Sequence, residues 1–237
     1  MFERFRHQMS EALIHRQREK LPNVTPLITG LVACTVFYIL LAIVTVPSHI
    51  ARNFHFVSEI GAITALSSFL LASASSFSLA SLVIHLLEDD RRVWLWIIMM
   101  IGFAFLAFDE LLQFHERLGN IISRYADSGI FRNWNDIIVI LYGVVALPIL
   151  LALLPTLMRY KMVVELFIVS FVFYGIHTFI DSTQEPSTTV STILEESAKL
   201  LSVEFLAIAA FVGFLGILWN FTPSNSARSG TGGGRRE

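Results

Sequence analysis

The stretch VWLWIIMMIGFAFLAFDELLQFHER, residues 93–117, opens with sixteen uncharged, mostly apolar residues and then turns abruptly polar. A helix through such a run is long enough to cross the hydrocarbon core of a membrane, which is about 30 Å thick and needs about 20 residues. Five other runs have a similar length and character. We place the six spans at 26–46, 60–87, 93–113, 136–158, 162–181 and 196–219. The predicted fold class is therefore an all-α integral membrane protein, a bundle of six transmembrane helices.

The composition agrees with this fold class. Hydrophobic residues make up 54% of the 237 residues and charged residues only 15%, whereas soluble domains carry about 25% charge. Spans and short connections use up almost the whole chain, so any chemistry has to be built from the helices and their ends. Cys34 is the single cysteine, which excludes an internal disulfide and a cysteine-based metal site.

The uneven distribution of Lys and Arg predicts the orientation. Six spans place twelve of these residues on the side of the N-terminus and five on the other side. The twelve are Arg4, Arg6, Arg16, Arg18, Lys20, Arg91, Arg92, Arg159, Lys161, Arg228, Arg235 and Arg236; the five are Arg52, Arg117, Arg124, Arg132 and Lys199. The positive-inside rule then makes both termini cytoplasmic. We expect a bacterial inner membrane or plasma membrane location, and no nucleic-acid partner, because topology accounts for the basic residues.

Three regions follow from this topology. Residues 1–25 form a cytoplasmic segment whose apolar residues recur at helical spacing among charges, which predicts an amphipathic helix at the membrane interface. Residues 26–220 form the six-helix transmembrane domain. Residues 221–237, rich in Gly and Ser, are predicted to be a disordered cytoplasmic tail. The segment 114–135 is predicted to be an outer loop that lies over the interface as a lid.

Acids and histidines gather near the outer ends of three predicted spans. At a rise of about 1.5 Å per residue, Asp109, His177 and Glu204 lie about 25, 24 and 22 Å from the inner boundary. Asp109 and Glu116 share one predicted helical stripe, and His177 and Asp181 are adjacent on another helix face. Ionisable groups at such depths are costly and call for partners or a function.

Carboxylate and imidazole groups together are typical ligands of Zn, Fe or Mn. We expect the metal ligands to come from Asp109, Glu110, His115, His177, Asp181 and Glu204. A metal ion with an open position could activate water, with Glu116 or Glu196 as general base. The leading hypothesis is therefore a metal-dependent enzyme that acts on a lipid or a lipid-linked substrate at the periplasmic or exterior face.

Two other functions remain open. Arg117 and Lys199 could neutralise Glu110, Glu116 and Glu196, because intramembrane ionisable groups commonly pair with one another. The cluster would then be a structural ion-pair network or a partner-docking site in a non-enzymatic membrane subunit. A proton- or metal-coupled transporter is the further alternative, with Glu204 as its deepest acid. The lipid bilayer is the one partner expected in all three cases.

Overall fold

The computed structural model describes residues 2–18, 22–46, 55–56, 61–87, 93–125, 134–183 and 189–221. Within these ranges the regular structure is helical, with no strands. Its helices are α1 (Phe2–Arg18), α2 (Thr25–Thr45), α4 (Ala62–Leu87), α5 (Val93–Leu112), α6 (Phe114–Ile122), α7 (Trp134–Leu157), α8 (Val163–Thr183) and α9 (Thr189–Phe221). Six of these, all but α1 and α6, are long and apolar enough to cross a membrane. The all-α prediction is confirmed, as is the presence of six helices long and apolar enough to span a membrane.

Two features differ clearly from the sequence prediction, whose other span limits lie within two residues of the helix ends. Helix α9 begins at Thr189, seven residues before the predicted start at 196. The segment 114–135, predicted to be a loop, contains α6. Both differences have one physical reason: apolar content locates the part of a helix that crosses the membrane, whereas residues of mixed polarity outside that part also form helix.

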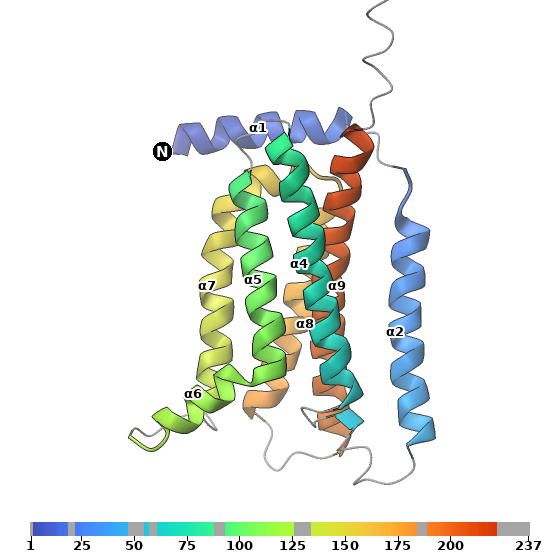
Figure 1. The fold of residues 1–237 in the computed structure, drawn as a ribbon, viewed down its shortest axis with the longest axis vertical. Helices are drawn as coiled ribbons and strands as arrows, with labels where there is room; N and C mark the ends of the chain where they lie inside the picture. Colours follow the sequence, from blue (N-terminus) through green and yellow to red (C-terminus); the bar gives the residue numbers. More distant parts are fainter. Residues whose placement is uncertain are drawn as a thin grey trace, which may run out of the picture.

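The centre of the bundle is built from α4, α5, α8 and α9. Helix α4 packs against α5 and α9, and α8 packs against α9. Small side chains allow this close approach: the Ser68 hydroxyl donates to the Ala107 carbonyl at 3.1 Å, and the Ser75 hydroxyl to the Met100 carbonyl at 2.9 Å. Helix α2 stands apart from these helices (Figure 1) and has few buried residues.

A buried aromatic cluster packs where α4, α5, α9 and the turn between α7 and α8 meet. The Trp96 indole is fully buried, and its ring centroid lies 5.5 Å from that of Tyr160. The Tyr160 hydroxyl is 3.0 Å from Nε2 of His85. A Cβ atom built on Gly213 would lie 2.9 Å from the Trp96 ring, so the absence of a side chain at Gly213 allows α9 to approach the indole.

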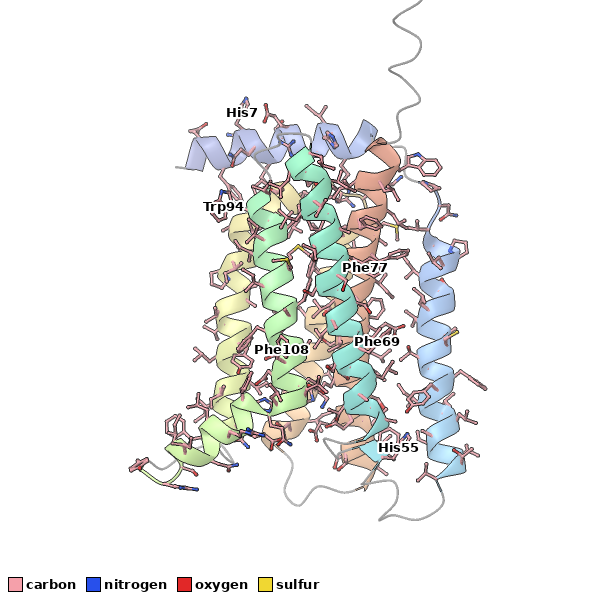
Figure 2. The ribbon with its side chains drawn as sticks, viewed as in Figure 1. His7, His55, Phe69, Phe77, Trp94 and Phe108 are labelled. Atoms are coloured by element: carbon pink, nitrogen blue, oxygen red, sulfur yellow. The ribbon has the colours of Figure 1, made fainter. Side chains whose placement is uncertain are left out.

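Helix α1 lies across one end of the bundle, where α9 also ends (Figure 1). It is held there by an ion pair between Arg16 and Glu165 of α8 and by the fully buried Ala12. Trp94, 68% exposed, lies near the same end (Figure 2). An exposed tryptophan at this level is typical of a membrane interface. The tail predicted to be disordered begins at Phe221, which instead ends α9; the rest of it, residues 222–237, lies outside the described residues.

Candidate functional site

The site lies at the end of the bundle opposite α1, where the chain breaks between α5 and α6 (Figure 1). Gln113 takes a left-handed conformation, with φ 57° and ψ 43°, and separates the two helices. A non-glycine residue in this region costs roughly 1–2 kcal/mol, so the surrounding contacts have to stabilise the break. The predicted stripe of Asp109 and Glu116 on one continuous helix is therefore wrong, because the break redirects α6.

Asp109 supplies those contacts. Its Oδ1 accepts a hydrogen bond from the backbone N–H of His115 at 2.9 Å, and its Oδ2 lies 2.8 Å from Nδ1 of the same residue. The first N–H groups of a helix have no partner inside the helix, so the carboxylate satisfies one of them at the start of α6. The Tyr142 hydroxyl of α7 donates to Oδ1 over a long 3.5 Å. Asp109 thus fastens α5, α6 and α7 together.

The same contact sets the properties of the His115 imidazole. Nδ1 bound to a carboxylate fixes the ring orientation and leaves Nε2 for other chemistry. Burial lowers the pKa of His115, but the hydrogen bond and the charge of Asp109 outweigh it, so the pKa is raised above 6.5. The side chain is 22% exposed, so water or a ligand has access to it.

Lys199 of α9 joins two acids from different helices. Its Nζ lies 3.1 Å from Oε1 of Glu110 on α5 and 2.8 Å from Oε2 of Glu196 on α9. All three side chains are at least three-quarters buried. Of the neutralising contacts expected from Arg117 and Lys199, the structure shows the ion pairs of Lys199 with Glu110 and Glu196. The ammonium therefore lies between two carboxylates that come from different helices.

Other residues of the predicted site lie around the Asp109–His115 pair and around Lys199 with its two acids. His177 is buried and hydrogen-bonds the backbone of Glu195. Asp181 acts electrostatically on Glu196, and Glu116 on His115. We call the whole group the acid–histidine cluster: Asp109, Glu110, His115, Glu116, His177, Asp181, Glu196 and Lys199.

Glu204 does not join the cluster. Its Oε1 accepts a hydrogen bond at 2.9 Å from the hydroxyl of Thr35, which belongs to α2. Depth along the last span groups Glu204 with the cluster, but depth does not define which neighbour a helix face meets. The sequence reasoning missed Thr35 and Tyr142. Their signal was a polar group inside an otherwise apolar run, which in lipid needs a hydrogen-bonding partner.

Among the residues that the structure describes, no three His, Cys, Asp or Glu side chains are arranged to hold a metal ion. The carboxylates of the cluster contact other partners. Both oxygens of Asp109 contact His115, and Glu110 and Glu196 each direct an oxygen to Lys199. In these contacts three carboxylates, those of Asp109, Glu110 and Glu196, share one ammonium and the imidazole of His115. The assignment of metal ligands stays a prediction.

The chain belongs to the family described as "Domain of unknown function (DUF8692)", whose match covers residues 21–213. No curated protein and no solved structure matches the chain.

Proposed function

We propose that this protein is a non-enzymatic membrane subunit whose acid–histidine cluster is a structural ion-pair network. In this proposal both termini are cytoplasmic and the cluster faces the periplasm or the cell exterior. The twelve-to-five distribution of Lys and Arg supports this orientation. So does the position of α1 and the end of α9 at the opposite end of the bundle (Figure 1).

The bridging of Glu110 and Glu196 by Lys199 is the observation that carries the proposal. One ammonium lies within 3.1 Å of an oxygen of each of two buried carboxylates. Charges buried in this way are tolerated when they are paired. A catalytic acid or base, by contrast, has to contact a substrate. The carboxylates of Glu110 and Glu196 contact the ammonium of Lys199 instead.

The network gives a fixed shape to the outer end of the bundle. It ties α5 to α9, and Asp109 ties α5 to the start of α6. Helix α6 then presents Phe114, Leu118 and Ile121, at i, i+4 and i+7, as an exposed apolar stripe. An amphipathic helix held at this level lies in the membrane interface or docks a partner.

Metal-dependent catalysis on a lipid is the second candidate, and the Asp109–His115 pair favours it. A carboxylate that orients a partly exposed imidazole is the arrangement of a general base or of a metal ligand with its supporting acid. The excess of carboxylates over cations would also favour a bound cation.

Elemental analysis separates the two candidates. The purified protein is analysed by mass spectrometry beside Asp109→Asn and His177→Ala, with Glu165→Gln at the α1 end as a matched acid substitution. The structural network predicts no stoichiometric Zn, Fe, Mn or Cu and a melting temperature unaffected by EDTA. Near-stoichiometric metal that is lost in the first two variants and kept in the third would overturn the proposal and support the enzyme.

A further inference from the structure

Glu204 is a buried acid that has no counter-ion among the residues that the structure describes. Its residue is 3% exposed, and its Oε2 is buried with no hydrogen-bond partner among the described residues. Its one hydrogen bond comes from the Thr35 hydroxyl, a neutral donor, at 2.9 Å. The Glu204 carboxyl is therefore not part of the acid–histidine cluster.

No titratable group of the surrounding helices is seen to pair with Glu204. Helix α2 contains no Asp, Glu, Lys or Arg, and its one thiol, Cys34, is exposed. Its Tyr38 is 3.2 Å from Nε2 of His55, which lies at the end of the bundle opposite α1 (Figure 2). In α4 the one titratable group is His85, near Tyr160 at the α1 end. The groups on α8 and on α9 itself are Glu165, Tyr174, His177, Asp181, Glu195, Glu196 and Lys199. The structure shows none of these in contact with Glu204.

Lys199 is the nearest cation along α9, five residues before Glu204. This separation is about 7.5 Å along a helix, and the ammonium is held by Glu110 and Glu196. A carboxylate in an apolar setting, with no cation and a single neutral hydrogen-bond donor, is strongly disfavoured relative to the neutral acid. The neutral acid keeps the Thr35 bond, since that bond is accepted by the carbonyl oxygen, and it needs no counter-charge.

We propose that Glu204 is a proton-binding site inside the membrane, and that its protonated side chain, bonded to Thr35, holds α2 against α9. Protonation of Glu204 would affect the position of α2 because this helix has few other contacts. It stands apart from the other helices (Figure 1), and its buried residues are limited to Ile39 and Ala42. Loss of the proton would place a bare charge at this sparse contact and draw water into it, so α2 would separate from α9.

Infrared spectroscopy tests the protonation state, because a neutral carboxylic acid has a carbonyl stretch that a carboxylate lacks. At neutral pH the wild-type protein is expected to show this band, Glu204→Gln to lose it, and Glu196→Gln, the matched acid paired with Lys199, to keep it. Thr35→Val should shift the band, since the carbonyl oxygen loses its donor. Equal bands in wild type and Glu204→Gln, or an unshifted band in Thr35→Val if Glu204→Gln does not fold, would overturn the assignment.

The coupling to α2 is tested by a distance measurement that uses the single native cysteine. Spin labels are placed on the exposed Cys34 of α2 and on Val190→Cys, 67% exposed on α9. Raising the pH from mildly acidic to strongly alkaline is expected to broaden the distance distribution in the parent protein and to leave it unchanged with Glu204→Gln. Distributions that do not respond to pH, or that broaden equally in both proteins, would refute the coupling.

Discussion

Lys199→Met removes the one cation that the structure places between Glu110 and Glu196, with little change in side-chain volume. The side chains of the three residues are 22%, 15% and 9% exposed, so solvent screens their charges only in part. After the substitution two buried carboxylates face each other without an ammonium between them. The structure therefore predicts a large loss of stability from a substitution that is apolar and helix-compatible.

The size of the loss follows from two independent routes. Removing one partner of a buried ion pair costs about 3–5 kcal/mol. Alternatively, one of the two glutamates can lose its charge by taking up a proton. For a glutamate of ordinary pKa this protonation costs about 3.7 kcal/mol at pH 7, at 1.36 kcal/mol per pH unit. The two estimates agree. For a protein of this size, a loss of about 3–5 kcal/mol lowers the melting temperature by about 6–20 °C.

The assay is thermal unfolding of the purified protein in detergent, followed by circular dichroism, beside Arg117→Met as the matched control. Arg117 is an exposed cation on α6 at the same end of the bundle, so its loss should change the melting temperature little. The deficit of Lys199→Met should shrink at pH 5, where protonation costs less, and adding Glu110→Gln and Glu196→Gln should restore part of it. A melting temperature within about 2 °C of the control, less than 1 kcal/mol for this size, would refute the network.

The Asp109–His115 pair should make stability depend on pH. Because the folded-state pKa of His115 is raised above 6.5, the charge-dependent part of the pair is fully present below that value and is lost as the pH rises through the raised pKa. The gap in melting temperature between wild type and Asp109→Asn, measured in EDTA, should therefore narrow on going to alkaline pH; a constant gap would contradict this. Gly213→Ala places a methyl group 2.9 Å from the fully buried Trp96 ring, and overpacking of this kind costs about 1–3 kcal/mol. Gly102→Ala, with nothing within 4 Å of its Cβ, should instead leave the melting temperature unchanged or raise it, and the reverse order would show that the packing around Trp96 is not limiting.

Much of the acid–histidine cluster was accessible to sequence reasoning. Depth along each apolar run placed Asp109 and His177 at a similar level, and charge balance pointed to Lys199 as the partner of Glu110 and Glu196. The same reasoning failed at Gln113, because nothing in its chemistry marks a left-handed residue inside an amphipathic pattern. It failed again at Glu204, because the helix that faces an acid follows from packing and not from its depth.

The sequence by itself determined the all-α class, the number of spans and their approximate limits, since these depend on local apolar length against the thickness of a bilayer. It also determined which residue types would be costly near the end of the bundle opposite α1. Only the tertiary structure decided the partners: Asp109 with His115 across a helix break, Lys199 between two acids, and Glu204 with Thr35 of a helix that is distant in the chain. The physical reason is that burial makes a charge require a neighbour, whereas the packing of helices determines which neighbour it has.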